Sequence, residues 1–189
     1  MSVLDLLRAD LDRQFRLSSS TKQANLLRIL TRVFHPRFFP LVIVRTAQAF
    51  QERRLSSVAQ LFAYLNLLLF GIDVATRCEI GPGFFLPHTS GTVIGASRIG
   101  RNVTIFQNVT LGAQHADMGW NVHKRPTVGD DVTLGAGCKV LGPVHVGNGS
   151  AVGANSVVLN DVPENSTVGG IPATVLKTAS GQRKTKVWL

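Results

Sequence analysis

Aliphatic side chains recur every six residues through the second half of the chain. The spacing runs unbroken from Val128 to Val158, and it recurs upstream from Val93 to Leu111. The ten positions are Val93, Ile99, Ile105, Leu111, Val128, Leu134, Val140, Val146, Val152 and Val158. Glycine follows the aliphatic residue in six of these ten units. A helix repeats roughly every 3.6 residues and a simple strand every two, so neither explains the spacing.

A six-residue period fits short strands joined by turns and wound around a triangular coil. The aliphatic side chain points into the prism at each level, and the glycine after it relieves a corner where a side chain would clash or φ must be positive. Stacked coils bury a continuous aliphatic column that no single repeat can form by itself. The pattern therefore predicts a mainly β protein, with a parallel β-helix over about residues 72–178.

Residues 1–71 follow a different pattern, with leucines at helical spacing. The spacing predicts helices before residue 18, after residue 21, over about 41–53 and over about 56–70. Gly71 is the expected stop signal of the last helix. We expect this N-terminal region to form a helical cap on the β-helix. Residues 179–189 form a basic segment, which we expect to be a mobile tail.

Residues 55–72 carry no charged side chain over 18 positions, which is the lower limit for crossing a bilayer. A spanning helix would have to satisfy the polar side chains of Ser56, Ser57, Gln60 and Asn66 internally. We therefore interpret the segment as a buried helix. Peripheral contact of the N-terminal helices with a membrane remains an alternative, because basic residues precede the segment. These residues are Arg37, Arg45, Arg53 and Arg54.

The six-residue period fails once, between Leu111 and Val128. The interval 113–126 is polar, and we expect it to extend from the coil as a loop. The loop contains polar and aromatic side chains that could take part in binding or catalysis, namely His115, Asp117, Trp120, His123, Lys124 and Arg125. Loops of this length in a compact domain are usually functional or disordered, and we favour a functional loop.

Composition narrows the classes of function. Charged residues make up only 16% of the chain and hydrophobic residues 44%, which excludes a disordered protein. Two cysteines cannot build a disulfide framework or a four-thiolate zinc site, and a cytoplasmic location is the default expectation. The net charge of +9 suggests either an anionic partner or a solvated basic surface.

Several motifs together resemble the left-handed β-helix acyltransferases, and most closely the serine acetyltransferase branch. These are the hexapeptide column, residues 86–91 (Leu-Pro-His-Thr-Ser-Gly), the loop 113–126 and residues 169–173 (Gly-Gly-Ile-Pro-Ala). The resemblance covers about residues 71–177. It implies a left-handed coil, acetyl-CoA as the co-substrate, a homotrimer or a pair of trimers, and no metal.

The resemblance assigns catalytic roles to His88 and Asp73. His88 would be the general base and Asp73 the carboxylate that orients it. An alcohol must lose its proton as it attacks a thioester, and a positioned imidazole can accept that proton. The two residues are 15 positions apart, close to one coil, so we expect them side by side. The alternatives are a structural histidine at a coil corner and an aspartate that caps the first coil.

The resemblance also implies a binding site for acetyl-CoA between two subunits. Small residues would let the pantetheine arm approach the backbone, residues near the C-terminal end would close the channel, and a lysine would meet the phosphates. The residues so assigned are Gly112, Ala136, Ala154, Gly170, Pro172 and Lys177. A solvated surface lysine is the alternative for Lys177.

The sequence departs from the family at positions expected to bind the acceptor. Pro87 stands where the family has an aspartate before the histidine, and His123, Lys124 and Arg125 stand where it has an Arg-His pair. We therefore expect these three residues to bind a small hydroxyl acceptor other than a free amino acid. A saccharide of glycan or exopolysaccharide biosynthesis is the main expectation, and L-serine in cysteine biosynthesis is the alternative.

Other classes of function fit the sequence less well. A β-helix carbonic anhydrase would need three zinc ligands, for which His88, His115 and His123 have unsuitable spacings. A non-catalytic scaffold would not need a polar constellation at a corner. Nucleic acid binding lacks a recognition motif. Cys78, Cys138 and His145 are expected to be structural or surface residues.

Overall fold

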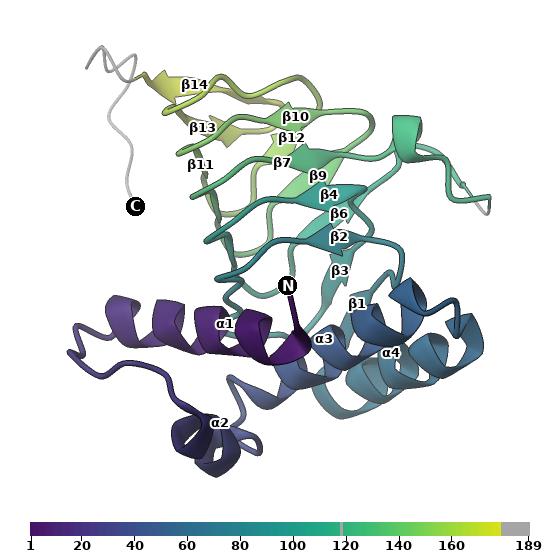
Figure 1. The fold of residues 1–189 in the computed structure, drawn as a ribbon. Helices are drawn as coiled ribbons and strands as arrows, with labels where there is room; N and C mark the ends of the chain where they lie inside the picture. The colour runs from purple at the N-terminus through teal and green to yellow at the C-terminus, as the bar shows by residue number, and fades with distance from the viewer. Residues whose placement is uncertain (118, 179–189) are drawn as a thin grey trace.

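The helices lie beneath a column of short strands, as Figure 1 shows. The computed structural model describes residues 1–117 and 119–178, so the predicted tail 179–189 lies outside the described residues. The helices are α1 (Val3–Leu17), α2 (Leu26–Arg32), α3 (Phe39–Glu52) and α4 (Ser56–Phe70). Gly71 ends α4 in the left-handed conformation, as expected of a stop signal.

Within the described residues, the strands form three faces of a prism. The first face contains β1 (Ile72–Val74), β3 (Thr92–Ile94), β6 (Thr110–Gly112), β9 (Lys139–Leu141) and β12 (Val157–Val158). The second contains β2 (Glu79–Ile80), β4 (Arg98–Ile99), β7 (Thr127–Val128) and β10 (His145–Val146). The third contains β5 (Thr104–Ile105), β8 (Thr133–Leu134), β11 (Ala151–Val152), β13 (Thr167–Gly170) and β14 (Ala173–Lys177).

Strands on each face pair in parallel with the strands one coil below and above. On the first face, for example, Val93 pairs with Asp73 below and with Thr110 above. The exception is β14, which pairs antiparallel with β13 and closes the upper end of the column. This ladder confirms the predicted parallel β-helix.

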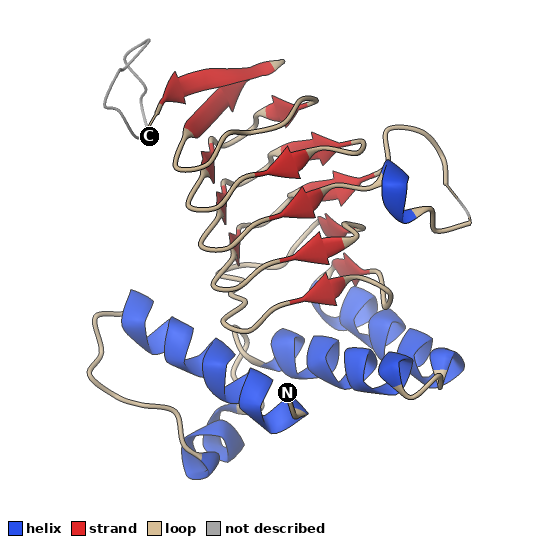
Figure 2. Cartoon of the chain, turned by 45° about the horizontal axis from the view of Figure 1, so that its top comes forward, coloured by secondary structure: helices blue, strands red, loops and turns tan. Residues whose placement is uncertain are grey.

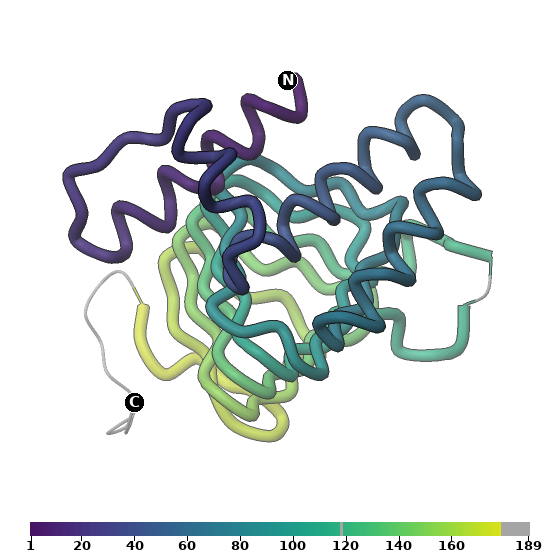
Figure 3. The backbone as a smooth tube through the Cα atoms, turned by 90° about the horizontal axis from the view of Figure 1, so that it is seen from below, coloured from purple at the N-terminus to yellow at the C-terminus, as the bar shows by residue number. Residues whose placement is uncertain are grey.

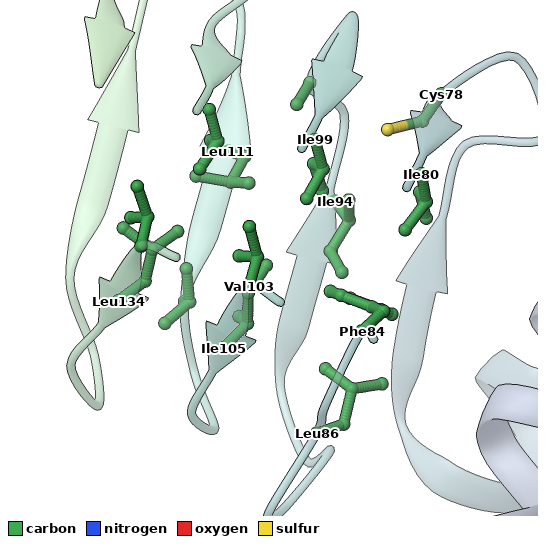
Figure 4. Packing of buried hydrophobic residues seen from close by; sticks show 14 of the residues in the cluster. Cys78, Ile80, Phe84, Leu86, Ile94, Ile99, Val103, Ile105, Leu111 and Leu134 are labelled. Carbon is green, nitrogen blue, oxygen red and sulfur yellow. The ribbon is translucent and has the colours of Figure 1, made fainter. Parts of the chain in front are cut away.

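The predicted aliphatic column is buried inside the prism, as Figure 4 shows for its lower coils. Val93 is the exception, because its side chain is 40% exposed, and Ile94 takes the inward position instead. The register explains the difference, since Ile94 pairs with the buried Leu111 whereas Val93 pairs with the outward Thr110. The assignment of Val93 to the column is therefore wrong by one residue.

The corners of the prism use glycine in two different ways. A Cβ built on Gly135 or Gly147 would lie within 2.7 Å of backbone atoms of the next coil, so close approach explains these glycines. Positive φ values occur at other positions of the repeat. At the corner between the third and first faces they recur once per coil, at Gly71, Gly91, Asn108, Gly137 and Asn155.

A buried ion pair joins the helical layer to the lowest coils. Arg45 of α3 donates through Nε and Nη2 to the carboxylate of Asp10 in α1, at 2.8 and 2.9 Å. The same guanidinium donates to the carbonyls of Ile80 and Gly81, and the backbone N–H of Phe84 donates to Asp10 at 2.8 Å. Arg45 was expected among the cations available to a membrane, but its side chain is buried.

Helix α4 is not the buried helix that the sequence suggested. It packs against α3 through small residues, Ala59 and Ala63, and through Asn66. Its leucines point outward, and Leu68 is 76% exposed, whereas Phe62 stacks on Phe50 of α3 at a ring-centroid distance of 5.5 Å. Among the described residues, no helix is long and apolar enough to span a membrane.

Candidate active site

His88 lies on the turn that leads from the third face into the first. The next residue, Thr89, donates its hydroxyl to the carbonyl of Phe70 at 2.9 Å, and the N–H of Gly91 donates to the carbonyl of Gly71 at 2.9 Å. These bonds fix the turn against the end of α4 and the start of β1. The strand that carries Asp73 is therefore the immediate neighbour of the turn that carries His88.

Asp73 and His88 are both exposed. Asp73 is the outward residue of β1, between the buried Ile72 and Val74. The imidazole is not packed inside the prism, so it remains available to a substrate. Within the described residues, no hydrogen bond or ion pair joins the two side chains. Their orienting contact therefore remains a prediction.

The corner that begins at His88 continues upward as a ladder of backbone hydrogen bonds. Asn108 donates to the carbonyl of Ser90 at 3.0 Å, Gly137 to Gln107 at 2.9 Å, and Asn155 to Ala136 at 2.8 Å. We call residues 88–91, 106–108, 135–137 and 153–155 the His88 corner. Ala136 and Ala154 lie on it, above His88, where their small side chains leave the backbone approachable.

Lys139 is a cation at this corner that the sequence analysis missed. Its Nζ donates to the backbone carbonyl of Asn108 at 2.5 Å, on the coil directly above Ser90. The signal was available in the repeat, because Lys139 precedes the inward Val140 and must therefore face outward. The lysine places a positive charge beside the proposed path of the donor.

The remaining residues assigned to the cofactor lie elsewhere in the single chain. Gly112 ends β6 at the corner between the first and second faces. Gly170 and Lys177 belong to the β13–β14 hairpin, in which Gly170 pairs with Ala173 and Lys177 with Thr167; Pro172 lies in its turn. One chain therefore does not bring the six assigned residues together.

The loop 113–126 extends from the prism and carries the 3-10 turn η1 (Val122–Lys124), as Figure 2 shows. Arg125 fastens the loop to the prism. The guanidinium donates to the carbonyl of Gly95 at 3.0 Å and to the carboxylate of Asp117 at 3.1 Å, and it stacks 3.9 Å from the ring centroid of Trp120. The side chains of Arg125 and Asp117 are only 11% and 7% exposed.

These contacts distinguish Arg125 from the other two residues that the sequence analysis assigned to acceptor binding. Arg125 is engaged within its own loop, whereas His123 and Lys124 lie on η1 with exposed side chains. The backbone N–H of Asn121 donates to Asp117 at 2.7 Å and, together with Arg125, holds the pKa of that carboxyl below its usual value. The loop is thus folded around an ion pair that is fully formed at neutral pH.

The other reactive groups do not form a second catalytic centre. Burial raises the pKa of the Cys78 and Cys138 thiols to about 12, so neither is a nucleophile at neutral pH. His145 is exposed, and its Nδ1 lies 2.9 Å from the hydroxyl of Thr127. The described residues contain no group of three or more side chains suited to holding a metal ion.

A hollow of about 740 Å³ lies away from His88, between the helical layer and the second face. Its rim carries mixed charges, among them Glu52, Glu79, Arg77 and Arg98. Because the second face is opposite the His88 corner, this hollow is not part of the candidate active site.

Comparison with known proteins identifies the class. A family model described as bacterial transferase hexapeptide (six repeats) matches residues 125–160. The serine acetyltransferase of Helicobacter pylori strain J99 is 38% identical over 145 residues, which cover 76% of this chain and 83% of that protein. The chain therefore belongs to the serine acetyltransferase family.

Other relatives are similar over a shorter part of their length. The serine acetyltransferase of Bacillus pumilus is 43% identical over 133 residues, which cover 70% of this chain and 60% of that protein. The chain thus spans about 60% of the length of that relative.

Solved structures agree with the fold. A serine acetyltransferase in complex with CoA superposes with a TM-score of 0.78 at 27% identity, covering 92% of this chain and 69% of that chain. The serine acetyltransferase of Neisseria gonorrhoeae gives a TM-score of 0.80 at 26% identity, covering 98% of this chain and 68% of that chain. The predicted left-handed β-helix with a helical cap is confirmed.

Proposed function

We propose that this chain transfers an acetyl group from acetyl-CoA to the hydroxyl group of a small acceptor, and that the acceptor is L-serine. The observation that carries the proposal is the exposed imidazole of His88, placed next to the strand of Asp73 in a member of this family. The names of the relatives support serine as the acceptor.

The proposed chemistry is a direct transfer. The imidazole of His88 accepts the proton of the acceptor hydroxyl as the oxygen attacks the thioester carbonyl. The C–S bond then breaks, and the leaving sulfur takes the proton from the imidazolium, so that free CoA and an ester are the products. Asp73 would fix the tautomer of His88 and stabilise the imidazolium. Backbone N–H groups of the corner would stabilise the oxyanion.

The donor site proposed for acetyl-CoA spans two subunits. Ala136 and Ala154 of one chain would line the pantetheine arm above His88, and Gly112 at the next corner would come from the partner chain. Gly170, Pro172 and Lys177 would lie at the far end, where Lys177 would meet the phosphates. Because these residues are dispersed in one chain, the proposed active form is a homotrimer.

A saccharide is the second candidate acceptor, favoured by two observations. Pro87 cannot supply the carboxylate that the family segment has before its histidine. Arg125 is engaged with Asp117 and Gly95, which leaves His123 and Lys124 as the side chains of the run that face outward.

A CoA-release assay with L-serine, free sugars and nucleotide sugars side by side tests the proposal. We expect release of free CoA with L-serine, whereas release with sugars alone would establish the second candidate. If no acceptor releases CoA and calorimetry detects no CoA binding, the chain is a non-catalytic scaffold and the proposed function is wrong.

A further inference from the structure

Gln107 carries a buried polar atom without a partner at the His88 corner. Its side-chain oxygen, Oε1, is buried, and within the described residues no group donates a hydrogen bond to it. The residue as a whole is only half-buried, so the amide nitrogen Nε2 is the end of the carboxamide that reaches the surface. A buried acceptor without a donor costs free energy, and its presence in a folded protein calls for an explanation such as a role in catalysis.

The other buried side-chain atoms that lack a partner in the described part of the chain lie elsewhere. They are Arg13 Nε and Asn66 Oδ1 in the helical layer, and Arg125 Nε in the loop 113–126. Gln107 is therefore the one among them that belongs to the corner of His88.

The register places Gln107 in the column that the acetyl-CoA path is proposed to follow. Viewed from below, the coils of the prism lie one behind another, so residues at the same place of a corner form a column (Figure 3). The N–H of Gly137 donates to the carbonyl of Gln107 at 2.9 Å, and the N–H of Asn155 donates to that of Ala136 at 2.8 Å. Gln107, Ala136 and Ala154 each lie two residues after a buried aliphatic residue. Gln107 is thus the member of this column directly below Ala136.

The turn beneath this glutamine is longer than the turn above it. The N–H groups of Ile105 and Asn108 donate to the carbonyls of Phe85 and Ser90, both at 3.0 Å. Three steps along the chain separate the two donors, whereas five steps separate the two acceptors. The lower turn therefore has two extra residues and bulges outward at His88. A substrate that lies against the imidazole is then about one strand spacing, roughly 4.8 Å, below the level of the glutamine.

Several backbone N–H groups of the His88 corner are committed to the hydrogen bonds between coils. Those of Gly91, Phe106, Asn108 and Gly137 donate to backbone carbonyls at distances from 2.9 to 3.1 Å. An oxyanion that forms at this corner cannot accept from these groups without breaking the ladder. A side-chain donor on the same corner would supply part of the stabilisation that the oxyanion needs.

We propose that Gln107 is a catalytic residue whose Nε2 donates a hydrogen bond to the carbonyl oxygen of the acetyl thioester. As the acceptor hydroxyl attacks, the carbonyl double bond opens and negative charge falls on that oxygen, so the hydrogen bond strengthens. The double bond forms again when the C–S bond breaks, and the proton passes from the hydroxyl through His88 to the sulfur. A carboxamide donates without exchanging that proton. This role rests on the acetyl transfer proposed above.

Gln107→Met tests the inference, because it keeps the length of the side chain and removes the donor. We expect kcat for CoA release to fall about 10²–10³-fold, as for the loss of one oxyanion donor. The Kd of free CoA, measured by calorimetry, should not change, because free CoA lacks the acetyl carbonyl. Gln51→Met is the matched control and should keep the rate, since Gln51 is a half-buried glutamine of α3 beside the hollow at the second face.

A spectroscopic measurement tests the same hydrogen bond without turnover. Acetyl-CoA labelled with carbon-13 at the thioester carbonyl is bound to the protein with no acceptor present, and infrared difference spectroscopy reads the carbonyl stretch. A donated hydrogen bond weakens the carbonyl bond and lowers its frequency. We expect a lower frequency on the unaltered chain and on Gln51→Met than on Gln107→Met.

A carbonyl frequency that Gln107→Met leaves unchanged overturns the inference, whatever the rate. A lower rate that comes with weaker binding of CoA, or with a smaller oligomer by light scattering, also overturns it, because Gln107 would then support the channel or the assembly. If acetyl-CoA binds and no acceptor releases CoA, the proposed function fails and the carbonyl frequency alone decides the role of Gln107. If acetyl-CoA does not bind the unaltered chain, both proposals are wrong.

Discussion

His88 is the residue on which the proposed chemistry depends. It is exposed at the start of a corner whose upper coils carry small residues, and its turn is tied to the strand of Asp73. A histidine with no chemical role would leave acetyl transfer unchanged when it is removed. A general base would not, because proton transfer from the hydroxyl accompanies the attack.

Replacing His88 with alanine should lower the rate of CoA release about 10²–10⁴-fold, because the imidazole supplies general-base catalysis. Circular dichroism and gel filtration should show an unchanged fold and oligomer. His145→Ala is the matched control, since His145 is also exposed but lies on the second face, and it should retain the rate. An unchanged rate in His88→Ala would refute the assignment.

Replacing Pro87 distinguishes between the two candidate acceptors, L-serine and a saccharide. Replacing it with aspartate restores the carboxylate of the family segment and should raise kcat/KM for L-serine through its amino group. Steady-state kinetics with serine and with the best sugar measure the change. If acceptor preference does not move, Pro87 does not select the acceptor and the main support for a saccharide disappears.

At the scale of elements, the loop 113–126 owes its shape to Arg125. The guanidinium meets a carbonyl, a carboxylate and an aromatic face at once, and a lysine cannot reproduce that planar geometry. The lowered pKa of Asp117 means that the stabilisation is complete at neutral pH. It is lost as the pH falls below the ordinary carboxyl value and through the lowered one.

Arg125→Lys should loosen the loop while the prism stays folded. Hydrogen–deuterium exchange in peptides from residues 113–126 should become faster, and KM for the acceptor should rise if the loop positions His123 and Lys124. Lys124→Gln is the matched control and should leave exchange unchanged, because Lys124 is exposed. Equal exchange in the two variants would contradict the fastening role of Arg125.

The junction between the helical layer and the prism is the second element that the structure explains. Arg45 and Asp10 are fully buried, and together they satisfy the carbonyls of Ile80 and Gly81 and the N–H of Phe84. Removing one partner would leave the other charge buried and unpaired, which is costly in free energy.

Arg45→Met should therefore lower the free energy of unfolding by about 3–5 kcal/mol. Urea denaturation measures the loss. Arg53→Met is the matched control, since Arg53 is exposed and should cost little. A loss in Arg45→Met no larger than in the control would show that the pair does not hold the junction.

At the scale of the whole molecule, the sequence predicts what repeats locally and misses what depends on distant contacts. The six-residue period predicted the coil and its inward column, because each aliphatic residue is positioned by its own short strand. Val93 was misassigned because the inward Leu86 and Ile94 are eight residues apart and Ile94 and Ile99 only five, so both corners beside β3 depart from the six-residue period. Such a shift is settled by pairing with the coils on either side.

The sequence likewise predicted the parts of the candidate site that depend on the repeat, and missed those that depend on distant contacts. The position of His88 beside the strand of Asp73 follows from their separation of about one coil. The role of Arg125 in holding its own loop could not be predicted, because Asp117 and Gly95 contact it only in the folded structure. The same holds for Arg45 and for the outward leucines of α4, since hydropathy does not say which side of a helix is covered.

A crystal structure of the chain with CoA bound tests the central claim most directly. The account predicts a trimer in which the CoA sulfur lies beside the His88 imidazole. The pantetheine arm should run along Ala136 and Ala154, with Gly112 of the partner subunit on its other side. A CoA molecule bound away from His88, or within the hollow beside the second face of a single chain, would contradict it.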